Sequence, residues 1–269
     1  MVVKNSWLKR SVQSTVLVYF LLLIVVPIVG VYVQGLSGGW AKFVESITQP
    51  IAWDAVYRTI KLALIATVIN TAVGTLIAWV LVRYKFPGRR LLNSLVDLPF
   101  ALPTAVGGLM ILLLLGPQSW LGSFLKGYDI EIVYQPTAIV IAMIFVTFPF
   151  VIRTIQPLLE ELDPTEEEAS FTLGASRSGT FWRVIFPAMR SGVVGGAMLA
   201  FSRALAEFGA VVLVAGNIPG KTLTASVQIY GNVESANSTG AAAVSVLLLT
   251  LSFVVLWSVN LLTAGRDAR

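Results

Sequence analysis

Apolar and polar stretches alternate along this chain in blocks of about twenty residues or more. The apolar blocks lie at about residues 15–35, 59–82, 94–116, 136–157, 191–216 and 241–264. An α-helix rises about 1.5 Å per residue, so about 20 residues cross the roughly 30 Å hydrocarbon core of a membrane. The pattern therefore predicts an all-α, polytopic membrane protein with six transmembrane helices.

The composition agrees with a membrane protein and narrows the chemistry. Of the 269 residues, 56% are hydrophobic and 12% are charged, which is too apolar for a soluble domain of this size. The chain has no cysteine and no histidine, so it lacks thiolates, the commonest general base and the commonest metal ligand. An intramembrane enzyme is therefore disfavoured, and we expect no catalytic residue and no metal site.

The lysines and arginines are distributed unevenly between the two sides that six spans create. One side holds Lys4, Lys9, Arg10, Arg83, Lys85, Arg89, Arg90, Arg153, Arg177, Arg183, Arg190, Arg266 and Arg269. The other side holds Lys42, Arg58, Lys61, Lys126 and Lys221, and Arg203 falls inside a span. Because positive charge collects on the cytoplasmic side, both termini are predicted to be cytoplasmic, and the net charge of +5 is a topology signal rather than a nucleic-acid surface.

This topology predicts a simple domain organisation. Residues 1–13 form a cytoplasmic N-terminal tail, and residues 14–265 form a single membrane domain with a cytoplasmic loop at 158–190. The first apolar block follows basic residues, as in a secretory signal, but it is longer than the apolar core of such a signal. We therefore expect it to be an uncleaved first span.

The loop at 158–190 is the longest charged passage in the chain and carries local helix signals. Asp163 and Pro164 are suited to the N-cap and the first position of a helix, and Glu166 would complete a capping box. Gly174 lies where a glycine ends a short helix. The pattern predicts a first short helix between these residues.

A second short helix is predicted to follow. Ser176 or Ser178 would cap it, Phe181 and Trp182 would lie on it, and Pro187 would limit it. Two short helices joined at a glycine elbow, Gly174, would expose apolar side chains to water, and a single subunit could not bury them by itself. A partner protein is therefore expected at this loop.

The same loop resembles the EAA signature of bacterial ABC importer permeases, E-A-A-x3-G-x9-I-x-L-P. Glu168-Ala169-Ser170, Gly174 and Val184-Ile185-Phe186-Pro187 stand at the matching positions, with Ser170 in place of the third residue, alanine. The resemblance implies two coupling helices, between spans four and five, that dock in a groove of a cytoplasmic ATPase. The implied coupling residues are Glu168, Ala169, Ser170, Gly174, Ala175, Phe181, Trp182 and Pro187.

The fifth block carries small residues at four-residue spacing and two charges. Gly192 with Gly196, and Ala200 with Ala204, would allow close helix packing. Arg203 and Glu207 lie one helical turn apart at membrane depth, where charges are costly and usually line a pathway or find a partner. Two interpretations stay open and can both hold: a pathway in which Arg203 helps an anion across, or an ion pair that neutralises itself.

The third block carries Pro99 and Pro103, which remove backbone donors and should kink the helix. A membrane helix broken by prolines exposes its helix ends to a cavity, which is a recurrent way to build an ion site. An equally weighted interpretation is that the two prolines only kink the helix for packing. The run from Asp97 to Gly108, with Arg83–Arg89 before it, resembles the T-type subunit of sulfate/thiosulfate ABC importers, within the MetI-like permease superfamily. Arg203–Ala210 resembles the fifth-span signature of sulfate, molybdate and tungstate permeases. The implied pathway or gate residues are Arg203, Glu207, Phe208, Asp97, Pro99, Pro103 and Thr104.

The resemblance implies an ATP-driven importer for sulfate and thiosulfate in the bacterial inner membrane, with this chain as half of the pathway. Its partners would be a second, W-type permease, a cytoplasmic ATPase dimer, an external sulfate-binding protein and membrane lipid, with no nucleic acid. The chain would bind no cofactor, because ATP and Mg²⁺ are used by the ATPase. The alternative is a homodimeric molybdate/tungstate permease; a channel would leave the docking loop unexplained.

Overall fold

The computed structural model describes residues 6–264, and these residues form helices and connecting loops without a strand. The first five residues of the predicted tail, and residue 265 at the end of the predicted domain, lie outside the described residues. The helices are α1 (Ser6–Phe20), α2 (Val26–Leu36), α3 (Gly39–Thr48), α4 (Pro50–Arg83), α5 (Arg89–Val96), α6 (Leu98–Ala101), α7 (Thr104–Leu115), α8 (Trp120–Lys126), α9 (Pro136–Glu161), α10 (Pro164–Thr172), α11 (Arg177–Thr180), α12 (Phe186–Leu205), α13 (Gly209–Val214), α14 (Ala225–Glu234) and α15 (Ser238–Ala264). The predicted all-α fold is confirmed.

Five helical stretches are long and apolar enough to cross a membrane. They are Lys9–Leu36, Pro50–Arg83, Pro136–Glu161, Arg177–Leu205 and Ser238–Ser258. A sixth candidate is the pair α7 and α8, which is bent by 53°. The chain is therefore a multi-pass membrane protein, and its third and fifth spans differ from the helices that the hydrophobic pattern predicted.

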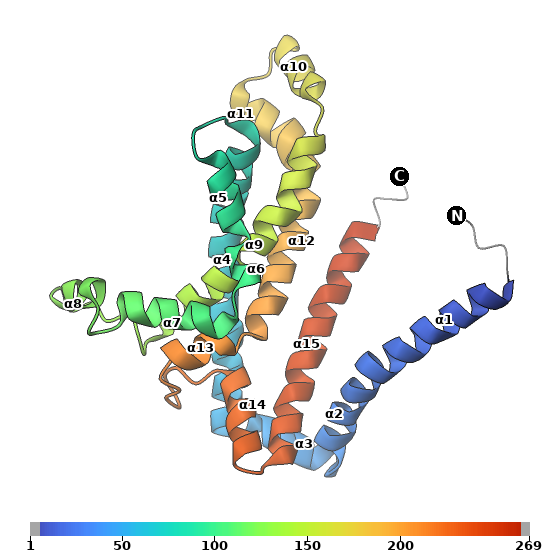
Figure 1. Cartoon of the computed structure of the whole chain (residues 1–269), viewed down its shortest axis with the longest axis vertical. Coiled ribbons are helices and arrows are strands. Elements are labelled where there is room, and N and C mark those ends of the chain that lie inside the picture. Colours follow the sequence, from blue (N-terminus) through green and yellow to red (C-terminus); the bar gives the residue numbers. More distant parts are fainter. Residues whose placement is uncertain (1–5, 265–269) are drawn as a thin grey trace.

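The third predicted span, residues 94–116, is not one helix. Its residues are divided among α5, α6 and α7, and α7 runs across the direction of α5 in Figure 1. Leu102, which precedes Pro103, has an extended backbone (φ −96°, ψ 138°), as residues before proline prefer. The prolines thus break the span completely rather than kinking it.

The fifth predicted span, residues 191–216, begins earlier and ends earlier than expected. A continuous helix runs from Arg177 to Leu205, and α13 starts separately at Gly209. The prediction that Pro187 limits a short second coupling helix is wrong. A π-helical turn at Phe181–Ile185, in which the N–H of Phe186 donates to the carbonyl of Phe181, takes up the proline and lets the helix continue.

The N-terminal helix extends away from the rest of the structure. In Figure 1, α1 points away from the other helices, whereas α2, which follows it in the chain, packs against α15. Because α1 begins at Ser6, residues 6–13 of the predicted tail are helical rather than a separate tail. The start of α1 and the end of α15 both lie nearer the α10 end than α3 and α14 do (Figure 1); their cytoplasmic location stays a prediction.

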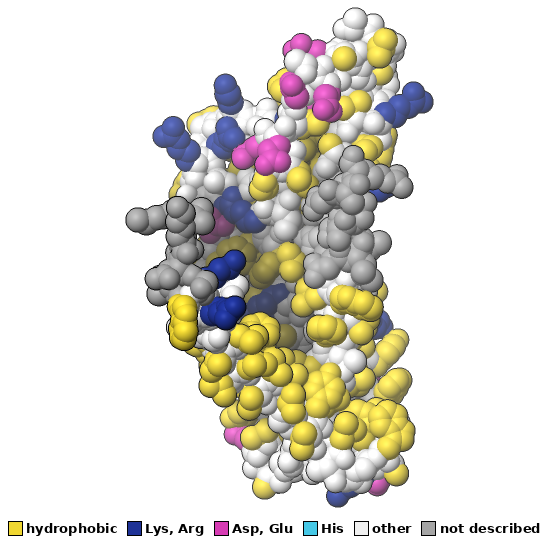
Figure 2. All heavy atoms as spheres, turned by 90° about the vertical axis from the view of Figure 1, so that its right-hand side faces the viewer, with side chains coloured by type: hydrophobic (Ala, Val, Ile, Leu, Met, Phe, Trp, Pro, Cys, Tyr) yellow, Lys and Arg dark blue, Asp and Glu magenta, His cyan; other side chains and the backbone are white. Residues whose placement is uncertain are grey.

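The surface separates apolar from charged side chains along the length of the molecule. In Figure 2 hydrophobic side chains cover the middle and lower parts of one face, and acidic and basic side chains gather toward the end where α10 lies. This division is typical of a membrane protein in which an apolar surface meets lipid and a charged end meets water.

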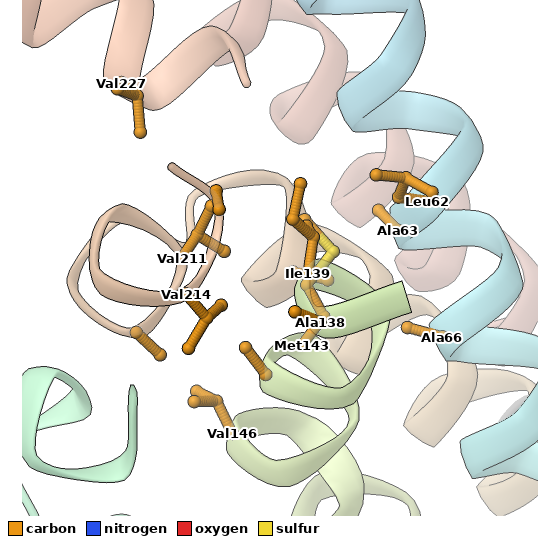
Figure 3. Close-up of a cluster of buried hydrophobic side chains, with 14 of the residues drawn as sticks. Leu62, Ala63, Ala66, Ala138, Ile139, Met143, Val146, Val211, Val214 and Val227 are labelled. Atoms are coloured by element: carbon orange, nitrogen blue, oxygen red, sulfur yellow. The ribbon is translucent and has the colours of Figure 1, made fainter. Parts of the chain in front are cut away.

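Helix α9 lies at the centre of the bundle, between α4 and α12 (Figure 1). Figure 3 shows Met143 and Val146 of α9 beside Val211 and Val214 of α13, with Ala66 of α4 nearby. Many of the buried positions are alanine, which allows the backbones to approach closely. This core holds the broken fifth span against an unbroken central helix.

Candidate coupling loop and translocation site

The first turn of α10 is capped by Asp163. The backbone N–H of Thr165 donates to Oδ1 of Asp163 at 2.9 Å, and Pro164 is the first helical residue. The hydrogen bonds from the backbone N–H and side chain of Thr165 hold the pKa of the Asp163 carboxyl below its ordinary value. The expected capping box is not formed, because the Glu166 side chain makes no hydrogen bond among the described contacts; the Glu166 backbone N–H donates to the Asp163 carbonyl at 3.1 Å.

Gly174 ends α10 in a left-handed backbone conformation, with φ of +84°. The N–H of Ala175 donates to the carbonyl of Ser170 at 3.1 Å, and the N–H of Gly174 donates to that of Phe171 at 2.9 Å. This pair of bonds is a Schellman motif, which favours glycine at the positive φ. The predicted glycine elbow is therefore present.

Ser176, and not Ser178, caps the second segment, because its Oγ accepts from the N–H of Gly179 at 3.1 Å. Ser170, the residue that departs from the EAA signature, lies 3.0 Å from Thr180 through their hydroxyl oxygens. Thr180 is buried. The serine thus makes a hydrogen bond across the elbow that alanine lacks.

The loop is anchored to the end of α4. Glu167 forms an ion pair with Arg83, and the guanidinium carbon of Arg83 lies 5.2 Å from the centre of the Trp79 ring. Phe181 packs against the same tryptophan edge to face, with ring centres 5.6 Å apart. Because contacts from both sides of the elbow converge on α4, the loop is held as one unit.

The outer surface of the loop exposes apolar side chains. Leu173 is 89% exposed, Trp182 60% and Phe171 46%. Glu168, Ala169, Gly174 and Pro187 are exposed beside them, whereas Ala175 and Phe181 are partly buried. Exposed apolar side chains at the charged end of the molecule, where the surface meets water, are suited to binding a protein partner.

Asp97, predicted as a gate residue, instead joins α5 to α9. Arg153 donates from Nε and Nη2 to the two carboxylate oxygens of Asp97, each at 2.7 Å. It also donates to the backbone carbonyl of Asn93 at 2.7 Å and to Oε1 of Gln156 at 2.5 Å. From the sequence, Arg153 contributed only to the topology prediction, because no local pattern pairs it with Asp97, which lies 56 positions earlier in the chain.

Arg203 and Glu207 meet at the break of the fifth span. Nη1 of Arg203, in the last turn of α12, lies 2.7 Å from Oε2 of Glu207. Oε1 of Glu207 accepts from the N–H of Ala210 at 2.9 Å and so caps α13. The Glu207 side chain is 1% exposed and that of Arg203 is 33% exposed, so the arginine keeps an open side.

The break of the third span lies against the break of the fifth. A Cβ atom added to Gly209 would lie 3.1 Å from the N of Ala105, and one added to Gly108 would lie 2.6 Å from the carbonyl oxygen of Ala210. Thr104, the first residue of α7, therefore lies beside the start of α13. Close approach at both glycines brings the two helix starts together near Glu207.

The predicted pathway residues fall into two groups. Pro103, Thr104, Arg203, Glu207 and Phe208 lie at the two breaks, and the Phe208 ring packs 5.2 Å from that of Tyr230. Asp97 makes its contacts with Arg153, and Pro99 is buried in α6. Among the described residues no group of acidic or metal-binding side chains is arranged to hold a metal ion.

Known proteins resemble the chain in both sequence and fold. Residues 70–267 match the family described as "Binding-protein-dependent transport system inner membrane component". A protein of Chlorokybus atmophyticus named "Probable sulfate transport system permease protein cysT" is 42% identical over 95% of this chain and 90% of its own length. The "Sulfate transport system permease protein CysT" of Escherichia coli K12 is 41% identical over 95% of this chain and 92% of its own length.

A solved structure shows the same architecture at low sequence identity. It is a chain of a bacterial alginate ABC transporter in complex with an alginate pentasaccharide-bound periplasmic protein. The TM-score is 0.80 at 16% identity, and the match covers 96% of this chain and 94% of that chain. The fold is thus that of an ABC transporter permease. The resemblance found in the motifs is confirmed, as is the expectation of a transport subunit rather than an enzyme. The chain belongs to the family of binding-protein-dependent transport system inner membrane components.

Proposed function

We propose that this chain is the permease subunit of an ATP-driven sulfate importer that also carries thiosulfate, and that it forms half of the translocation pathway. The observation that carries the proposal is the partly exposed Arg203 at the meeting point of two broken spans. Sulfate is the expected ion because near-full-length relatives at 41–42% identity are named sulfate permeases.

The site offers the chemistry that an oxyanion needs. The guanidinium of Arg203 binds oxyanions through several hydrogen bonds. The N–H groups of Thr104 and Ala105, at the start of α7 and next to Gly209 of α13, make no hydrogen bond within the described residues. A helix start carries partial positive charge and unpaired donors, as do half-helices at transporter sites. Glu207 holds Arg203 in place when no anion is bound and releases it when one arrives.

The continuous helix from Arg177 to Leu205 connects the coupling loop to this site. Ser176 caps one end of this helix, about 40 Å from Arg203 at about 1.5 Å per residue, and Trp182 is about 32 Å from Arg203 along the helix. A cytoplasmic ATPase that docks on Glu168, Leu173 and Trp182 would move this helix when ATP drives its closure. Arg203 would then move relative to the start of α7, which switches access to the site.

The remaining partners follow from this role. They are a second, W-type permease subunit, a dimeric ATPase that uses ATP and Mg²⁺, and an external sulfate-binding protein, assembled in the bacterial inner membrane. The solved alginate transporter, which contains a bound periplasmic protein, supports such an assembly. The chain itself binds no cofactor in this scheme.

Radiolabelled sulfate uptake into proteoliposomes tests the proposal. The chain is reconstituted with its ATPase, second permease and binding protein, and each component is omitted in turn, with thiosulfate and molybdate as competitors. We expect ATP-dependent uptake that requires every component, yields to thiosulfate and resists molybdate. Uptake without the second permease that molybdate blocks would instead indicate a homodimeric molybdate/tungstate permease.

A further inference from the structure

A cavity of about 670 Å³ lies beside the loop that joins α4 to α5. Its lining includes Lys85, Arg89 and Arg90, together with Glu160 from the end of α9. This loop is at the same end of the molecule as α10 and α11 (Figure 1). The cavity is therefore distinct from the Arg203 site, which lies at the other end of α12.

The charges around the cavity are unbalanced. Among the described residues Lys85, Arg89 and Arg90 form no ion pair, whereas the nearby Arg83 and Arg153 each have a carboxylate partner. Glu160 is the single carboxylate in the lining. Three cations close together repel one another, and a bound anion removes that repulsion.

The backbone adds donors to the same cavity. Helix α5 begins at Arg89, and its N-cap, Gly88, has φ of +84° and offers no side chain to cap the helix. The N–H groups of Arg90 and Leu91 make no hydrogen bond within the described residues. Unpaired donors in a first helical turn, beside cationic side chains, form an environment suited to phosphate or sulfate groups.

An apolar surface continues from the cavity. Leu91 also lines it and is 65% exposed, and Leu92 and Leu95 of the same helix are 42% and 47% exposed. Cations next to exposed leucines at the end of a membrane helix suit an amphiphile with an anionic head and an apolar chain.

We propose that this cavity binds a tetrahedral oxyanion at Lys85, Arg89, Arg90 and the first turn of α5. Two sources have this chemistry: the phosphate of an anionic phospholipid headgroup, and a free oxyanion such as phosphate or sulfate. Occupancy would fix the α4–α5 loop at the membrane surface, next to the Arg153 cluster that joins α5 to α9.

The test uses the purified full-length chain in detergent micelles. In one arm it is titrated with phosphatidylglycerol or phosphatidylcholine, and bound lipid is read by native mass spectrometry. In the other arm, equilibrium binding of radiolabelled sulfate and phosphate is measured. Each arm compares the wild type with Lys85→Gln, Arg89→Gln, Arg90→Gln and Glu160→Gln. Arg190→Gln, an exposed arginine on α12, is the matched control.

We expect each cation substitution to weaken binding about tenfold, as the loss of a charge-assisted hydrogen bond does. Glu160→Gln should tighten binding, which a misfolded variant would not do. If the cation variants bind phosphatidylglycerol more weakly and Glu160→Gln binds it more tightly, with no such change for phosphatidylcholine, the ligand is an anionic lipid headgroup. If the same changes occur for sulfate or phosphate, the ligand is a free oxyanion. If the four substitutions alter neither arm more than Arg190→Gln does, the proposal is overturned.

Discussion

Nη1 of Arg203 lies 2.7 Å from Oε2 of Glu207, and this ion pair crosses the point where α12 ends. The glutamate is buried and also caps α13 through Ala210, while the arginine is one-third exposed. Of the two interpretations that the sequence left open, the ion pair is formed. The pathway role stays a prediction that is compatible with it, because the pair has one open side.

Substitution of Arg203 should lower the stability of the protein more than substitution of Glu207. Arg203→Gln leaves a buried carboxylate oxygen without its cation, which costs about 3–5 kcal/mol. Glu207→Gln keeps an oxygen for the N–H of Ala210 and leaves an arginine that reaches an open side, so it should cost less. Thermal unfolding of the purified variants measures both, and sulfate uptake should fall most for Arg203→Gln and less for Arg203→Lys.

The double variant Arg203→Gln/Glu207→Gln should recover much of the stability lost by Arg203→Gln. Lys126→Gln removes an exposed pair with Glu131 at 3.8 Å and should cost about 1 kcal/mol or less. Strictly additive losses in the double variant would contradict the pairing.

Coupling should depend on the backbone at Gly174. An added Cβ meets no atom within 4 Å, so Gly174→Ala introduces only the strain of φ at +84°, about 1–2 kcal/mol. We expect less sulfate moved per ATP hydrolysed in the reconstituted importer, because the elbow that presents Leu173 shifts. Glu168→Ala should lower the same ratio through the exposed docking surface.

Gly231→Ala is the matched control for Gly174→Ala. Gly231 also has open space around it, but it lies in α14 with an ordinary helical backbone. An unchanged transport-to-hydrolysis ratio in both Gly174→Ala and Glu168→Ala would argue against this loop as the coupling element.

Two glycines on one helix should respond in opposite ways to alanine. At Gly192 an added Cβ would lie 2.6 Å from the carbonyl oxygen of Thr154 on α9, so the helices must separate, at about 1–3 kcal/mol. At Gly195 it would meet no atom within 4 Å, and alanine should stabilise the helix by about 0.5–1 kcal/mol. Apparent melting temperatures in detergent should fall for Gly192→Ala and not for Gly195→Ala; equal shifts would rule out close packing here.

Acidification should loosen the first turn of α10. The folded-state pKa of Asp163 is lowered by its hydrogen bonds to Thr165, so the stabilisation is present above the unfolded pKa of about 3.9 and is lost as pH falls through the folded value. The amide chemical shift of Thr165 should titrate with a midpoint below the ordinary aspartate pKa. Asp163→Asn, which keeps the acceptor but does not ionise, should remove this titration; a midpoint at or above the ordinary value would refute the cap.

Local sequence signals were sufficient for the unbroken membrane helices and for the helix cap and glycine turn in the loop at 158–190. Block length and hydropathy predicted the long helices α4, α9 and α15 because a membrane span needs a fixed length of apolar helix. Asp163 and Gly174 were assigned correctly because a helix cap depends on backbone groups within five residues. The family could also be recognised from such short motifs.

Tertiary structure decided where the helices break and which charges pair. Pro187 lies inside a continuous helix because a π-helical turn accommodates it, and a proline alone does not reveal that turn. The packing of α13 against α7 and α9 places Glu207 beyond the end of α12. Arg153 finds Asp97 across 56 residues of chain. Contacts of this kind depend on which helix faces meet in the bundle, and the order of residues along one helix does not specify its neighbours.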